Sequence, residues 1–190
     1  DGGAFAQERE VKNILLVAIT SNRGLCGAFN SNIIKKAKSL AENDYSDVDV
    51  SFLTIGKKGS EFFAKNGFIV HSSHDSLYDE LTFENTSAIA EDIMQNFLSG
   101  EFDKVILVYN QFKNAATQLV QTEQFLPVET PTEEGATIGD YIFEPSKEKI
   151  IADLIPKSLK IQLFKGVLDS HASEHGARMT AMHKATDNAG

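Results

Sequence analysis

The chain has 190 residues, of which 42% are hydrophobic and 24% are charged, and its formal net charge is −9. This length suits one domain with a sizeable core, and the composition is that of an ordinary globular protein. The longest apolar run, residues 14–19, is far shorter than the ~20 residues that span a bilayer, so membrane insertion is not expected. The single cysteine, Cys26, excludes an internal disulfide and suits a reducing compartment. We interpret residues 1–4 as a cut end rather than a signal peptide.

The charge is unevenly distributed along the chain. Residues 67–144 carry 2 basic and 14 acidic side chains, a net charge of −12. This acidic middle argues against nucleic-acid binding, which needs clustered Lys and Arg. Residues 145–190 carry 7 basic and 5 acidic side chains, and this mildly basic end is either a solvated face or a contact for an acidic partner.

Strands and helices are predicted to alternate through the first two thirds of the chain, which indicates an α/β fold. In chain order we expect a buried strand at 11–20, a helix at 30–42, a strand at 48–55, a helix at 60–65, a short strand at 68–71, a helix from about 82 to 98, and strands at 104–109, 117–125 and 141–143. Asn30 or Ser31 is expected to cap the first helix, and Thr82, Asn85 or Thr86 the third. The strand at 117–125 alternates in hydropathy and is placed near a sheet edge. Residues 130–139 are expected to form a loop.

The last third of the chain is predicted to be helical. A helix opens at Pro145, and Pro156 is expected to break or kink it. From there a second helix of about 34 residues, or roughly 50 Å, runs to the end of the chain. It has too few large apolar residues for an ordinary core helix, so part of it should project. We expect Gly176 to weaken it and its end to fray, because Gly costs about 1 kcal/mol relative to Ala in a helix.

The segment Ser21–Gly27 lies between a buried strand and a helix, the position at which open α/β sheets bind phosphates. It matches neither the G-x-G-x-x-G fingerprint nor the P-loop motif, so a tight structural turn with a buried, structural Cys26 is the favoured interpretation. A Rossmann-type nucleotide-binding enzyme remains an alternative.

A second candidate is the segment His171–His175, which formally matches the H-x-x-E-H pattern of zinc peptidases. A hydrolase needs a third ligand, and Asp187 is the only acidic residue after His175. Packing of both His side chains in a helix seam is favoured, and a zinc hydrolase remains the weaker alternative. No serine triad or paired-carboxylate site stands out, and Glu133 and Glu134 fall in the predicted loop.

Two segments resemble the signature segments of the γ subunit of F-type ATP synthases: Ser21–Asn30 and Ser173–Gly190, in the same order and with similar spacing. The resemblance implies a Rossmann-like three-layer domain with a roughly five-stranded sheet that has lost nucleotide binding, over residues 1–157. Residues 158–190 would be the start of the long C-terminal shaft helix. The family's N-terminal helix, and the rest of the C-terminal helix with which it forms an antiparallel coiled coil, are expected to be missing.

The resemblance also implies a mechanical function without catalytic residues, cofactor or metal. The family's γ subunit is the central-stalk rotor that couples proton-driven c-ring rotation to cycling of the α3β3 hexamer, with α, β, ε and the c-ring as partners. The absence of a chloroplast-type cysteine insertion points to a bacterial enzyme, so the resemblance implies a location at the cytoplasmic face of a bacterial plasma membrane. Three residues are expected to face the β subunit through adaptable contacts: Arg178, Met179 and Met182. Simple helix packing is the alternative, which their spacing leaves open. The family's signature loop comprises Arg23, Gly24, Leu25, Cys26 and Gly27.

A helix of this kind without its partner would expose an apolar seam, through which the chain could self-associate. The seam is predicted to comprise Phe164, Val167, His171, His175, Met179 and Met182.

Overall fold

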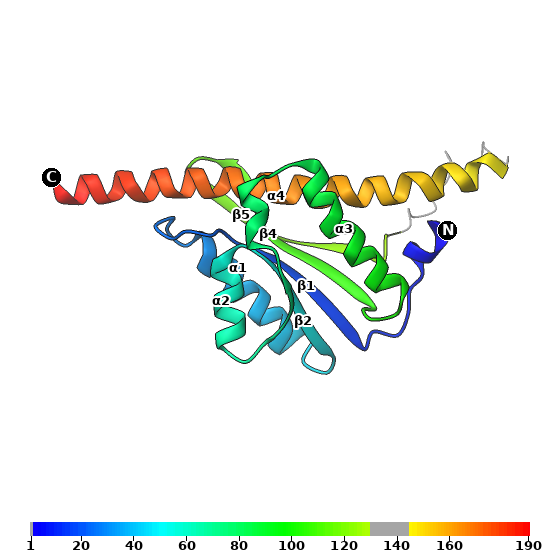
Figure 1. Cartoon of the computed structure of the whole chain (residues 1–190). Coiled ribbons are helices and arrows are strands. Elements are labelled where there is room, and N and C mark those ends of the chain that lie inside the picture. The colour runs from blue at the N-terminus through cyan, green and yellow to red at the C-terminus, as the bar shows by residue number, and fades with distance from the viewer. Residues whose placement is uncertain (1, 130–144) are drawn as a thin grey trace.

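A five-stranded sheet in the order β3-β2-β1-β4-β5 forms the centre of the molecule. A computed structural model describes residues 2–129 and 145–190 of the chain (Figure 1). The strands are β1 (Asn13–Ile19), β2 (Asp49–Ile55), β3 (Ile69–Ser73), β4 (Lys104–Asn114) and β5 (Thr117–Leu126). The first four are parallel, and β5 pairs antiparallel with β4 at the edge of the sheet. The prediction of a five-stranded α/β sheet with 117–125 at an edge is therefore confirmed.

Helices cover both faces of the sheet because the central strand β1 is hydrophobic on both sides. Successive side chains of a strand point to opposite faces. Leu15 and Val17 join a core cluster with residues of α3 (Phe83–Leu98) and α4 (Pro145–Ala189). Ile14 and Leu16 join a second cluster with residues of α1 (Phe29–Ser39) and α2 (Lys57–Lys65). These clusters give the three-layer, Rossmann-like arrangement expected from the sequence.

Several helix boundaries differ from the prediction. The helix α1 begins at Phe29, with Ala28 at its N-cap position, and a π-helical turn, η2 (Leu40–Asp44), continues it. Asn30 does not cap α1, because its side-chain oxygen accepts the backbone N–H of Ser21 instead. Thr82, one of the three predicted candidates, caps α3: its side chain accepts a hydrogen bond from the backbone N–H of Asn85.

The structure adds two 3-10 helices, η1 (Gly2–Ala6) and η3 (Asp75–Asp79). The predicted strand at 141–143 and loop at 130–139, with Glu133 and Glu134, lie outside the described residues.

The prediction of a break at Pro156 is wrong, because α4 is a single helix of 45 residues. At 1.5 Å per residue it is about 68 Å long. Beyond Pro156 the helix is held to the sheet by Leu159, Leu163 and Val167, which are all buried and offset the hydrogen bond lost at the proline. Both ends of α4 pass beyond the α/β body (Figure 1), and residues 182–190 are all exposed. The expectation that part of this helix projects is confirmed.

Candidate functional site at the junction of the two signature segments

The loop Ser21–Gly27 is held in one shape by its own polar side chains. The Ser21 hydroxyl donates to the carbonyl oxygen of Arg23 at 2.6 Å, and the Asn30 amide donates to the Ser21 hydroxyl at 2.9 Å. Leu25 has a φ of 61° and is 88% exposed at the loop tip, whereas the neighbouring Cys26 is buried. The loop is therefore a tight turn with a structural cysteine, as the sequence predicts.

The helix α4 crosses this loop, so the structure brings the two signature segments together. We call the contact between Ser21–Gly27 and Ser173–Arg178 the junction. The guanidinium of Arg178 donates to a Glu174 carboxylate oxygen at 2.7 Å, and weakly to the Gly24 carbonyl at 3.4 Å. The side chains of this ion pair are only 14% and 10% exposed. Low exposure strengthens such a pair, because solvent screens it less.

Beneath the ion pair, apolar and polar side chains fill the space at the carboxyl ends of β1 and β4. Ala177 packs on Cys26 and Phe29. The fully buried Asn110, at the end of the apolar part of β4, donates to the Phe29 carbonyl at 3.0 Å. The Ser173 hydroxyl donates to the Asn110 carbonyl at 3.3 Å. Since doubly wound sheets bind nucleotides at this position, these contacts disfavour a nucleotide-binding enzyme here.

Gly176 allows the β4–β5 hairpin to approach α4 closely. A Cβ added at Gly176 would lie 2.7 Å from the carbonyl oxygen of Ala115 and 2.9 Å from its Cα. The next turn adds a hydrogen bond, since the Thr180 hydroxyl reaches the same carbonyl at 3.2 Å. The helix does not end or break at Gly176 but continues to Ala189. Glycine therefore serves here for close packing, and fraying of the helix end stays a prediction.

The two histidines of the H-x-x-E-H pattern lie on one face of α4, with their Nε2 atoms 3.3 Å apart. The His171 ring stacks on Tyr78 of η3, with ring centroids 5.7 Å apart. The Tyr78 hydroxyl donates to the carbonyl of Thr20 at 2.6 Å, and burial raises the pKa of this hydroxyl. Among the described residues, no group of three His, Cys, Asp or Glu side chains is placed to hold a metal. A catalytic zinc site with three protein ligands is therefore not found in this part of the chain.

Several of the remaining predicted site residues are exposed. Met179 and Met182 are 56% and 61% exposed on the projecting part of α4, and Arg23 is exposed on the loop. The predicted apolar seam is wrong at Val167, which is fully buried against the sheet. The exposed face of α4 instead includes Ile161 and Leu168.

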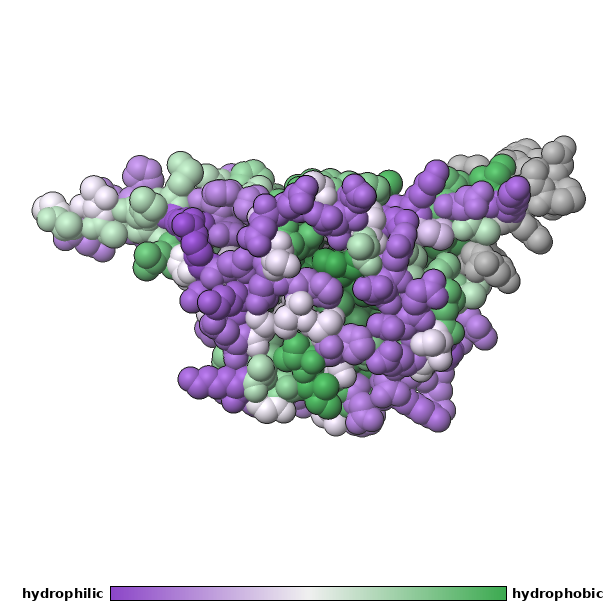
Figure 2. All heavy atoms as spheres, viewed as in Figure 1, coloured by the Kyte–Doolittle hydropathy of each residue, from purple (hydrophilic) through white to green (hydrophobic). Residues whose placement is uncertain are grey.

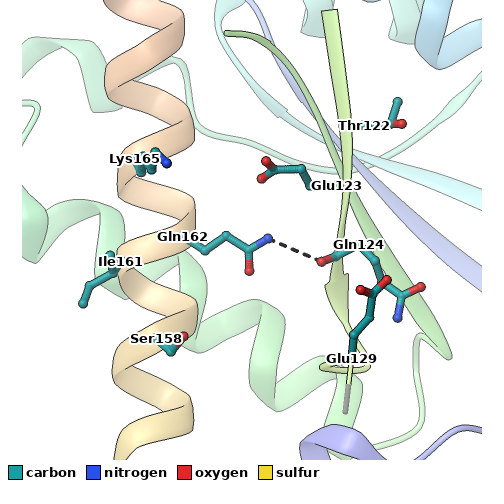
Figure 3. A pocket seen from close by; sticks show the side chains of 8 residues that line it. All are labelled: Thr122, Glu123, Gln124, Glu129, Ser158, Ile161, Gln162 and Lys165. Carbon is teal, nitrogen blue, oxygen red and sulfur yellow. Dashed lines mark hydrogen bonds between the residues drawn. The ribbon is translucent and has the colours of Figure 1, made fainter. Parts of the chain in front are cut away.

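A pocket of about 600 Å³ lies between β5 and α4 (Figure 3). Its walls carry both charges, with Glu123 and Glu129 on the β5 side and Lys165 on α4. Gln162 spans the pocket by donating to the Gln124 carbonyl at 3.3 Å. Glu123 also accepts a 2.7 Å hydrogen bond from the Tyr109 hydroxyl. Gln162 of α4 thus satisfies one backbone acceptor, the Gln124 carbonyl, at the free edge of β5.

The sequence analysis did not single out Asn110 or Tyr78, although both position the junction. Asn110 directly follows the buried run of β4, and a polar residue at the carboxyl end of a buried strand is a usable signal. Tyr78 lies in a polar segment that we predicted as a loop, and no local pattern marks it. In the described part of the chain, no helix is long and apolar enough to cross a membrane.

Comparison with known proteins places this arrangement in a family. A family model described as ATP synthase matches residues 2–190. The ATP synthase gamma chain of Flavobacterium johnsoniae is 62% identical over 189 residues, and that of Christiangramia forsetii 60% over 188 residues. Each alignment covers 99% of this chain, which spans about 65% of the length of these relatives.

Solved structures agree with the sequence relatives. A chain in the central stalk and c-ring structure of the Tetrahymena thermophila mitochondrial ATP synthase is 27% identical, with a TM-score of 0.72 over 97% of this chain and 81% of that one. A chain in the rotor of the Euglena gracilis mitochondrial enzyme shares the fold, with a TM-score of 0.68 at 19% identity over 98% of this chain and 75% of that one. The chain therefore belongs to the ATP synthase γ-chain family.

Proposed function

We propose that this chain is part of the central-stalk rotor of an F-type ATP synthase, coupling proton-driven rotation of the c-ring to the conformational cycle of the α3β3 hexamer. The observation that carries the proposal is family membership over residues 2–190, combined with a helix that extends past the α/β body at both ends. A rotor transmits torque, which requires a rigid lever fixed to a body. In this role the chain supplies no catalytic residue, cofactor or metal, and the chemistry belongs to other subunits.

Support for a shaft comes from the face of α4 that points away from the sheet. Exposed residues recur there at intervals of seven: Leu154, Ile161, Leu168, His175 and Met182. We call this set the outer stripe. Seven-residue spacing is the pattern by which helices wind around each other. We therefore propose that a second helix packs on the outer stripe, with residues 1–157 as the body and 158–190 as the shaft, although α4 itself begins at Pro145.

The proposed partners follow from the same role: the α, β and ε subunits and the c-ring, at the cytoplasmic face of a bacterial plasma membrane. The 60–62% identical relatives are bacterial γ chains, which supports this location. The space-filling view shows that most of the visible face of the body is hydrophilic, as a body in aqueous contact requires, and that the C-terminal end of α4 stands clear of it (Figure 2). The proposed self-association of the chain would now use the outer stripe.

Three residues of the projecting helix are proposed to contact the β subunit. Met179 and Met182 are exposed and have adaptable side chains, as a contact with three successive subunits requires. Arg178 is different, because Glu174 and the Gly24 carbonyl already bind its guanidinium. An Arg178→Glu variant would place two carboxylates together at the junction, so it would also disturb the fold. Testing Arg178 therefore needs milder substitutions.

We predict that Arg178→Gln lowers coupling in the assembled enzyme, whereas Glu174→Gln leaves it close to normal. Glu174→Gln keeps the arginine and weakens its internal ion pair, so it separates a contact with the β subunit from an internal role. The measurement is ATP-driven proton pumping at a matched rate of ATP hydrolysis. Equal loss in both variants would contradict the β-subunit contact and leave Arg178 as a residue of the junction alone.

The proposed rotor role is tested by binding to the ε subunit. Chain 1–190 should form a stable one-to-one complex with the ε subunit of the same organism in size-exclusion chromatography. The folded state of the chain is checked beforehand by its circular dichroism and cooperative unfolding. A folded chain that binds no ε at concentrations well above micromolar would count against the proposal.

A further inference from the structure

We propose that His171 and His175 form a two-histidine chelate on α4 for one divalent first-row transition-metal ion, with zinc as the ion that fits best. The inference is separate from the rotor role, because it rests only on ring nitrogens of the described chain. It is also separate from a hydrolase, which would need a third protein ligand.

The spacing of the two nitrogens matches a metal site. The Nε2 atoms of His171 and His175 are 3.3 Å apart. Two nitrogens that each lie about 2.0–2.1 Å from one tetrahedral zinc are separated by roughly 3.3–3.4 Å. The rings are already in contact, with centroids 4.6 Å apart and an interplanar angle of 79°. The 3.3 Å contact is a hydrogen bond in which one ring donates to the other, so a bound ion would take the place of that proton, and water would fill the open positions.

The surroundings of His171 prepare its outer nitrogen for this role. Its Nδ1 is buried without a hydrogen-bond partner and lies 3.8 Å from a Glu174 carboxylate oxygen. A proton on Nδ1 is attracted by that carboxylate, so the favoured tautomer leaves the lone pair on Nε2. Carboxylates behind metal-binding histidines act in this way. Stacking on Tyr78 fixes the plane of the ring.

The place of the site on α4 also bears on helix packing. Because His175 belongs to the outer stripe, an ion bound here would compete with any helix that packs on the stripe at this turn.

The test is isothermal titration of chain 1–190 with zinc chloride at pH 7.5. We expect one zinc ion per chain, and affinity at least about tenfold weaker in His171→Gln and in His175→Gln, since even outer-shell changes at such sites cost that much. The matched control is His183→Gln, because His183 is an exposed histidine of the same helix. Copper should bind more tightly than nickel at this site. Circular dichroism verifies that each variant remains folded.

A spectroscopic readout locates the ion. Nitrogen-15 spectra of the histidine rings should show zinc on Nε2 of His171 with the proton retained on Nδ1. Glu174→Gln should weaken zinc binding without removing it. Absence of zinc binding up to millimolar concentrations, unchanged affinity in His175→Gln, or loss of binding in His183→Gln would each overturn the chelate.

Discussion

At the scale of single residues, the junction depends on one glycine that sequence rules describe as a weakness. In the middle of a helix Gly176 is unfavourable by about 1 kcal/mol relative to Ala. Its α-carbon, however, faces the backbone of Ala115, which cannot move aside as a flexible side chain could. Steric fit, rather than helix propensity, therefore decides how the residue at position 176 affects the stability of the chain.

We predict that Gly176→Ala destabilises the chain by about 1–3 kcal/mol, the usual cost of overpacking, because its methyl group would lie within 2.7 Å of the Ala115 oxygen. The control is Gly166→Ala in the same helix, where an added Cβ would make only ordinary contacts, with the Tyr109 ring at 3.8 Å and the Ile19 side chain at 3.9 Å. That variant should be neutral or gain up to about 1 kcal/mol. Urea denaturation of both variants measures the difference, and equal effects would contradict the close-packing role.

Another residue, Asp103, links stability to pH. Burial alone would raise the pKa of Asp103, but hydrogen bonds from the N–H groups of Lys12 and Asn13, together with Arg9, outweigh it and lower that pKa. A lowered folded-state pKa contributes stability above the ordinary aspartate pKa of about 3.9, which is lost as the pH falls through the folded value.

We therefore expect Asp103→Asn to cost about 1.5–3 kcal/mol at pH 7, as hydrogen bonds to charged groups do. The cost should shrink as the pH falls from about 5 toward 2. Unfolding free energies measured across this range provide the test. A cost that stays constant with pH would show that the ionised form of Asp103 does not matter.

At the scale of elements, α4 has two faces with opposite roles. One face packs on the sheet through fully buried residues such as Leu163, and the other presents the outer stripe to solvent. We predict that Leu163→Ala costs about 2–5 kcal/mol through cavity formation. Ile161→Ala removes a side chain that is 59% exposed, so it should change stability by less than about 0.5 kcal/mol. Similar costs in thermal or urea unfolding would mean that the faces are wrongly assigned.

The elements also show what can be predicted from the sequence. Strand β1 was identifiable because a strand buried on both faces has no polar positions, and β5 because its alternating hydropathy suits an edge. Pro156 misled the prediction because the local rule ignores the burial of Leu159 and Leu163 beyond it. The junction could not be derived from spacing, since it joins residues such as Gly24 and Arg178, which are 154 positions apart. The resemblance to a family identified both segments, but not their contact.

At the scale of the whole molecule, a long helix lies along the α/β body and passes beyond it at both ends (Figure 1), which is the form that the proposed lever needs. The junction, the Gly176 approach and the buried face of α4 all fix the helix to the sheet at several points along its length. A shaft that must carry torque needs this attachment, because a helix held at one point would turn without moving the body.

The most direct test of the rotor proposal is an exchange within a complete γ chain. In the Flavobacterium johnsoniae γ chain, the 189 matched residues would be replaced by those of this chain, and ATP-driven proton pumping would be measured in membrane vesicles. The control chimaera carries Leu163→Asp, which should prevent folding and assembly. We predict that the exchanged enzyme assembles and pumps protons. An enzyme that assembles and hydrolyses ATP but pumps no protons would contradict the account.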